Sequence, residues 1–132
     1  MSSAFATARQ YQQAQVATAD RGRLLMLMFE GALKFLARAE AALAEGELEP
    51  FGVALGRAEA VIAELLHTLD FKAGGEVARD LDRLYRFMLD HLVEANLHKS
   101  PVHVAQVARV LGIIAGAYRE ILDGGMQATH AA

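Results

Sequence analysis

Apolar residues recur every three or four positions through four long stretches of the chain. This spacing places the apolar side chains along one face of an α-helix, where they can be buried together. No stretch shows the strict alternation of apolar and polar residues that is typical of a half-buried strand. The pattern therefore predicts four helices, at about residues 20–45, 50–71, 76–98 and 101–122.

The residues between the predicted helices favour short connections. Asp20 and Ser100 can cap helix N-termini through a side-chain oxygen, and Pro50 suits a first helical turn. Gly74-Gly75 can supply the positive φ of a sharp reversal. Helices joined by such short connections pack antiparallel to their neighbours. We therefore predict an all-α protein, an antiparallel up-down four-helix bundle that spans residues 20–123.

Two segments lie outside the predicted bundle. Residues 1–19 are small and polar, so we expect a short mobile N-terminal arm, and residues 124–132 form a C-terminal tail. Tyr11 and Val16 are isolated larger side chains within this arm. A tyrosine in a mobile arm can dock into an apolar groove through its ring while its hydroxyl stays hydrated, or it can be incidental to function. Both interpretations remain open.

The composition indicates a large apolar surface for a chain of 132 residues. Apolar residues make up 54% of the chain before glycine is counted, whereas soluble domains contain about 45–50% with glycine included. The mean hydropathy of +0.21 points the same way. Either the core is large for this size, or apolar surface is left over for a partner.

Charge and residue types exclude several functional classes. The formal net charge of -3 argues against a nucleic-acid-binding protein, which would carry a basic stripe. The absence of cysteine excludes disulfides and thiolate metal sites. Residues 1–16 lack the layout of a signal peptide, and no run approaches the about 18 apolar residues of a membrane span. We expect a soluble cytoplasmic protein without direct membrane insertion.

No set of residues has the spacing of a catalytic or metal centre. A di-iron bundle needs two Glu-x-x-His motifs, whereas residues 94–98 have the wrong spacing and no second copy exists. The five histidines are scattered, and a lone histidine is usually a surface or hydrogen-bonded residue. Gly74-Gly75 lacks the Gly-Lys-Ser/Thr ending of a phosphate-binding loop. We expect no enzyme activity, cofactor or metal, with a bundle-core enzyme or metal carrier kept as a rival interpretation.

The last predicted helix carries the first candidates for a binding surface. Gly112 and Gly116 lie four residues apart and remove side-chain bulk from one face. This face is either a groove for a partner helix or a site of close packing inside the bundle. Val110, Ile113 and Ala117 extend the apolar surface beyond the inward stripe and favour the groove. The alternative candidates lie on the second and third helices, at Leu55, Ile62, Leu66 and Leu84.

Two groups of residues resemble the flagellar secretion chaperone family, FliS. The first group comprises Tyr11, Val16-Ala17-Thr18-Ala19 and residues 24–32. The second group comprises Leu69-Asp70-Phe71, Gly74-Gly75-Glu76, Leu81, Leu84-Tyr85, Met88 and residues 92–96. Their order and spacing match the family over about residues 11–122. Two departures are Asp20-Arg21-Gly22-Arg23, where the family often has serine-proline, and Tyr118, near a position that is often tryptophan.

The resemblance implies a cytosolic chaperone that binds the disordered C-terminal segment of flagellin. Such a chaperone prevents premature polymerisation of flagellin and assists its delivery to the flagellar type III export gate, so a gate component is a second implied partner. The expected mode is helix-in-groove recognition. The alternative is a self-associating helical-bundle adaptor with a non-flagellin helical partner, in which the extra apolar face forms a homodimer.

Overall fold

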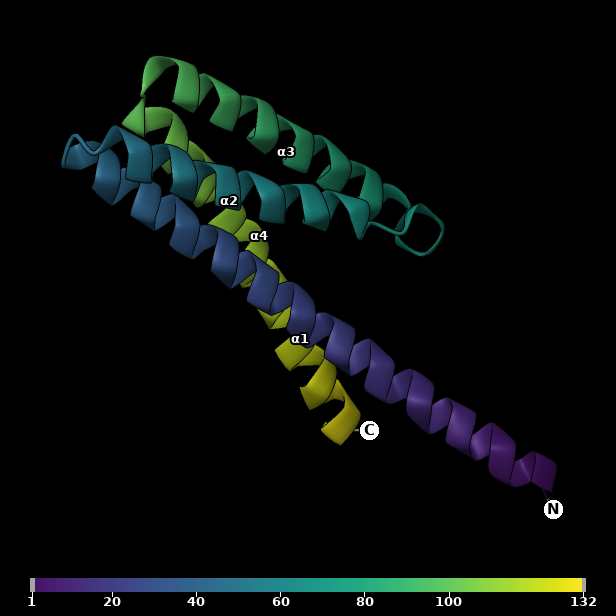
Figure 1. The fold of residues 1–132 in the computed structure, drawn as a ribbon. Coiled ribbons are helices and arrows are strands. Elements are labelled where there is room, and N and C mark those ends of the chain that lie inside the picture. The colour runs from purple at the N-terminus through teal and green to yellow at the C-terminus, as the bar shows by residue number, and fades with distance from the viewer. Residues whose placement is uncertain (1, 132) are drawn as a thin grey trace.

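A computed structural model describes residues 2–131 of the chain, and side chains are described for residues 21–124. Four helices follow one another: α1 (Ser2–Ala44), α2 (Leu48–His67), α3 (Phe71–His98) and α4 (Pro101–Ala131). Each helix runs antiparallel to the one before it, as Figure 1 shows. The stretch from 2 to 131 contains no strand. The all-α up-down four-helix bundle predicted from the sequence is therefore confirmed.

The helices are arranged so that α1 and α3 lie on opposite sides of the bundle. α1 packs against α2 and α4, and α3 packs against the same two helices. α1 and α4 come close at Gly22, where an added Cβ would lie 2.9 Å from the Cδ2 methyl of Leu122. Beyond this end of the bundle, the N-terminal turns of α1 extend away from the other helices (Figure 1).

The core is formed by the inward stripes of all four helices, which the 3.6-residue period of the sequence places on facing surfaces. Its largest enclosed side chains are Phe29, Leu36, Phe51, Leu55, Ile62, Leu65, Met88, Leu92, Val104, Val107 and Leu111. No buried residue among positions 21–124 is polar or charged apart from the phenol of Tyr85. Alanines fill the narrow places between these side chains and allow the helices to approach.

The helix boundaries differ from the predicted ones for local reasons. α1 begins at Ser2, so Asp20 lies inside the helix and does not cap it. Residues 4–20 contain neither glycine nor proline, and nothing in that stretch interrupts a helix. At the other end, α4 continues through Gly124-Gly125, because glycine lowers helix propensity by about 1 kcal/mol without terminating a helix. Mobility of residues 1–19 stays a prediction.

The connection between α2 and α3 also departs from expectation. α2 ends at His67, where the Thr68 hydroxyl donates to the Leu65 carbonyl (2.6 Å). The Asp70 carboxylate then caps α3, accepting from the backbone N–H groups of Lys72 (3.0 Å) and Ala73 (3.1 Å). Gly75 interrupts α3 with φ of 52°, the positive value expected from the double glycine. Residues 68–70, which were predicted to lie in the second helix, thus form the connection, and Phe71 begins α3.

One segment of the described chain, Pro101–Gly124, meets the length and mean hydropathy of a membrane-spanning helix. Core helices of bundles meet the same criteria. Val104, Val107 and Leu111 of this segment are fully enclosed in the core, but only 22% of the apolar window is buried. α4 therefore carries an apolar surface beyond its core-facing stripe.

Candidate functional site

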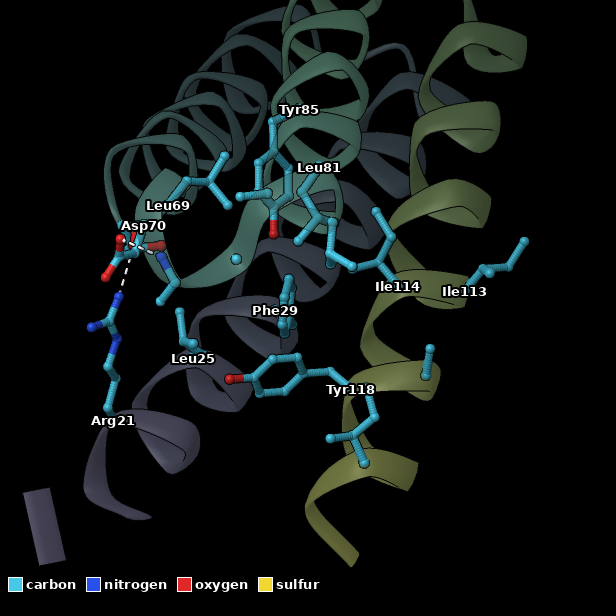
Figure 2. A pocket seen from close by; sticks show the side chains of 17 residues that line it. Arg21, Leu25, Phe29, Leu69, Asp70, Leu81, Tyr85, Ile113, Ile114 and Tyr118 are labelled. Carbon is cyan, nitrogen blue, oxygen red and sulfur yellow. Dashed lines mark hydrogen bonds between the residues drawn. The ribbon is translucent and has the colours of Figure 1, made fainter. Parts of the chain in front are cut away.

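An apolar pocket of about 550 Å³ opens between α1, α3, α4 and the α2–α3 connection (Figure 2). It is lined by Arg21, Leu25, Phe29, Thr68, Leu69, Asp70, Ala73, Gly74, Val77, Ala78, Leu81, Tyr85, Ile113, Ile114, Ala117, Tyr118 and Ile121. The lining is mostly aliphatic and aromatic, which is typical of sites that bind apolar ligands or side chains.

The pocket exists because the start of α3 presents small residues to the interior. Ala73, Gly74 and Ala78 face the space that larger side chains fill farther along the bundle. A Cβ at Gly74 would come within 2.8 Å of the Ala78 Cβ, so the backbone there requires glycine. Gly75 turns the chain with its positive φ and sets the direction of the rest of α3. The double glycine therefore shapes the pocket as well as the turn.

Aromatic rings form the floor of the pocket. Phe29 of α1 is 2% exposed, and its ring centroid lies 5.6 Å from that of Tyr118 on α4. Figure 2 shows Tyr85 reaching down from α3 toward Phe29, and Ile114 turned toward Leu81. Three helices thus supply the floor, and none of them forms the pocket alone.

The polar rim on one side is held by its own hydrogen bonds. The Arg21 guanidinium donates through Nη2 to the Thr68 carbonyl oxygen over 2.8 Å and so ties α1 to the end of α2. The Asp70 carboxylate is turned to the first turn of α3, which it caps. Both residues line the pocket. The rim therefore keeps a fixed shape while the guanidinium remains exposed beside the opening.

Tyr85 is the polar side chain at the base of the pocket. Its side chain is almost wholly enclosed, with the residue 2% exposed. Burial, and secondarily the neighbouring Tyr118, raises the pKa of Tyr85 to about 12. The hydroxyl is therefore protonated at every physiological pH and can donate a hydrogen bond.

The raised pKa of Tyr85 predicts a loss of stability in alkaline solution. The unfolded chain releases this proton near pH 10 and the folded protein near pH 12, so the contribution is complete below pH 10 and lost above it. Between pH 9 and pH 11, the wild type should lose about 1 kcal/mol of unfolding free energy that Tyr85→Phe does not lose. Urea denaturation of both proteins at the two pH values measures the difference, and equal losses would contradict the assignment.

Two of the residues predicted on the last helix line the pocket, Ile113 and Ala117. Ile113 is 65% exposed and lies at the outer edge of α4 (Figure 2). Val110 is half-buried and packs against the core, and Leu84 is 37% exposed on α3, outside the lining.

The residues predicted on α2 lie in the interior. Leu55 and Ile62 are 1% and 0% exposed and belong to the core, so they present no free surface to a partner. Leu66 is half-buried against that core. The alternative that Leu55 and Ile62 contact a partner is therefore corrected, because both side chains are enclosed in the core.

Gly112 and Gly116 face open space. Among the residues whose side chains are described, an ideal Cβ at either position meets no atom within 4 Å, so these residues do not pack closely against either glycine. Neither glycine lines the pocket that contains Ile113 and Ala117. Of the five α4 candidates, only Ile113 and Ala117 line this pocket, and contact of the other three with a client stays a prediction.

The open space at Gly116 predicts a mild effect of substitution. Gly116→Leu should leave the free protein as stable as the wild type or raise its unfolding free energy by up to about 1 kcal/mol, because the side chain clashes with nothing and leucine favours a helix. Thermal and urea denaturation measure this. A loss of 1–3 kcal/mol, the usual cost of overpacking, would show that the position is packed.

Tyr11 and Val16 have side chains outside the described range 21–124, so their contribution to the pocket stays a prediction. Apart from Ile113 and Ala117, the sequence did not single out the residues of this pocket as a site; Leu25, Leu81, Tyr85 and Tyr118 are examples. The helical spacing of these apolar and aromatic residues indicated burial, but it could not show that one end of the interior remains empty.

The histidines do not assemble into a metal centre in the described residues. The rings of His91 and His103 lie 4.4 Å apart between α3 and α4. His91 pairs with Gln106, and His103 Nδ1 pairs with the Ser100 hydroxyl (2.7 Å). Between positions 21 and 124, no three histidine, cysteine, aspartate or glutamate side chains are grouped, whereas a structural zinc site needs four ligands.

Comparison with known proteins agrees with the resemblance found in the sequence. The model of the family described as flagellar protein FliS matches residues 4–124. The chain is 38% identical over 107 residues to the flagellar secretion chaperone FliSB of Pseudomonas aeruginosa, with 78% of this chain and 85% of that protein covered. It is 33% identical over 111 residues to the flagellar secretion chaperone FliS of Campylobacter jejuni (84% and 87% covered). It is 34% identical over 110 residues to that of Salmonella typhimurium (83% and 82% covered). The chain belongs to the FliS family of flagellar secretion chaperones.

Proposed function

We propose that this protein is a cytosolic chaperone for the disordered C-terminal segment of flagellin. By binding that segment it prevents premature polymerisation and assists delivery of flagellin to the flagellar type III export gate. The observation that carries the proposal is the apolar pocket between α1, α3 and α4, present in a chain whose relatives are named flagellar secretion chaperones. Those names describe chaperones and no catalytic activity.

The pocket has the properties that helix-in-groove recognition requires. An amphipathic helix inserts apolar side chains at positions i, i+3, i+4 and i+7 into a groove between helices. Val77 is 66% exposed and Ile121 is 68% exposed, and both line the pocket together with the more enclosed Leu81. Apolar side chains of this exposure gain most when a partner covers them, because burial contributes roughly 25 cal/mol per Å².

A disordered client loses conformational entropy when it binds. The client segment must form helix on the chaperone surface, and this ordering offsets part of the gain from apolar burial. The balance gives a reversible complex, which a chaperone needs in order to release its client.

Binding of a flagellin C-terminal peptide tests the proposal directly. Isothermal titration calorimetry should show one peptide per chain and a negative heat-capacity change, the marker of apolar burial. Circular dichroism should show helix gained by the peptide. Absence of binding at about 10 μM peptide would contradict the proposal. Size-exclusion mass with and without peptide distinguishes client binding from the self-associating adaptor, which would be a dimer without peptide.

A further inference from the structure

The Tyr85 hydroxyl is a polar group that faces the pocket. The residue is 2% exposed, but its hydroxyl oxygen is not one of the sealed, unpaired polar atoms of positions 21–124, so the oxygen is open to the pocket. In Figure 2 the hydroxyl points from α3 into the middle of the pocket, above Phe29. Buried hydroxyls in proteins nearly always have a hydrogen-bond partner. A molecule that fills this pocket and expels its water must therefore supply one.

The partner must be an acceptor on an otherwise apolar ligand. Burial keeps the phenol protonated, since its pKa is about 12, so the hydroxyl is available as a donor. The surrounding side chains are Phe29, Leu81 and Ile114, which offer nothing to a charged ligand. The occupant that fits this environment is an apolar segment with one uncharged hydrogen-bond acceptor.

A helical client leaves main-chain carbonyls unpaired at one end only. Within a helix every carbonyl accepts from the N–H four residues on, and only the last four carbonyls lack this partner. Burying those carbonyls in an apolar pocket without a donor would cost about 1–3 kcal/mol each. The Tyr85 hydroxyl removes that cost for one carbonyl at the C-terminal turn, whereas carbonyls in the middle of a helix are already paired and gain less from it.

The charges at the rim of the pocket also favour binding of the C-terminal end of a helix. The exposed Arg21 guanidinium lies at the opening of the pocket and donates one N–H to the Thr68 carbonyl oxygen. A helix C-terminus carries about half a negative charge and is stabilised by a nearby cation. The Asp70 carboxylate opposes this effect little, because it is bound to the positive N-terminus of α3 through Lys72 and Ala73.

We infer that the pocket binds the C-terminal turn of an amphipathic client helix, with a free main-chain carbonyl of that turn accepting a hydrogen bond from the Tyr85 hydroxyl. The inference rests on the proposed function, in which the client is the C-terminal segment of flagellin. It adds which part of a bound helix enters the pocket and which side chain selects it.

The test compares wild type, Tyr85→Phe and Ser100→Ala in titrations with a flagellin C-terminal peptide at pH 7. Tyr85→Phe keeps the ring and should lower affinity between about 5-fold and 100-fold, the effect of leaving a buried carbonyl without its donor. Ser100→Ala is the control. It also removes one hydroxyl, but Ser100 precedes α4 outside the pocket lining, where its hydroxyl pairs with His103, so affinity should stay within about 2-fold of the wild type.

Nuclear magnetic resonance of the complex identifies the part of the peptide that is bound. With labelled peptide, the Tyr85 ring protons should show contacts to the last turn of a bound helix. Contacts to its first turn or its middle would overturn the inference, and so would equal affinities of wild type and Tyr85→Phe. Failure of the wild type to bind the peptide is a different result, which overturns the proposed function and with it the inference.

Discussion

Val77→Asp is expected to lower the affinity for the flagellin C-terminal peptide at least 100-fold while the bundle remains folded. Val77 lines the pocket from the first regular turn of α3 and is 66% exposed in the free protein. Covering valine with a client contributes about 1.5–3 kcal/mol, and covering a carboxylate in its place costs several more. The free protein tolerates aspartate there, because the side chain is exposed and an acidic residue suits the first turn of a helix.

Val102→Asp supplies the matched control for this experiment. Val102 is also an exposed valine (60%) in the first turn of a helix, but it begins α4 at the opposite end of the bundle (Figure 1). Its replacement should leave peptide affinity within about 2-fold of the wild type, since it removes no part of the pocket. Calorimetric affinity and thermal midpoints of both variants are the measurements. An equal loss of affinity in the two variants would show that charge, and not the pocket, governs binding.

The four helices could be predicted because each must bury one apolar stripe. The stripes repeat with the helical period, and short connections leave the antiparallel bundle as the simple way to bury all four. The helix boundaries could be predicted less accurately, because they depend on which local hydrogen bonds form at each helix end. Asp70 could extend the second helix or cap the third, and its side-chain bonds to Lys72 and Ala73 decide in favour of the cap.

The candidate site could be predicted only in part, because the period of a helix shows which residues are apolar and not what covers them. Ile113 and Ala117 were found because they lie off the inward stripe of α4. Leu55 and Ile62 were alternative candidates for a binding surface, and the structure encloses both in the core. The Tyr85 hydroxyl faces a pocket because Ala73, Gly74 and Ala78 are too small to fill that end of the bundle.

A core substitution is expected to change stability as strongly as the pocket substitution changes affinity. Leu92 of α3 is 0% exposed and lies in the cluster shared by all four helices. Leu92→Ala should lower the unfolding free energy by about 2–5 kcal/mol, because the loss of apolar burial and the cavity left behind each destabilise the folded protein. A domain of this size has only about 5–15 kcal/mol in total, so the variant should approach the limit of folding at 37 °C.

Leu97→Ala on the same helix separates burial from helix propensity. Leu97 is 69% exposed, and leucine and alanine have nearly equal helix propensities, so this change should cost less than about 0.5 kcal/mol. Urea denaturation of both variants measures the two values, and similar losses would mean that Leu92 is not enclosed as described.

Excess flagellin peptide should raise the denaturation midpoint of Leu92→Ala, because a ligand that binds only the folded state stabilises that state, and more so the tighter it binds. The same excess should leave Val77→Asp unchanged, since that variant keeps the core but loses the pocket.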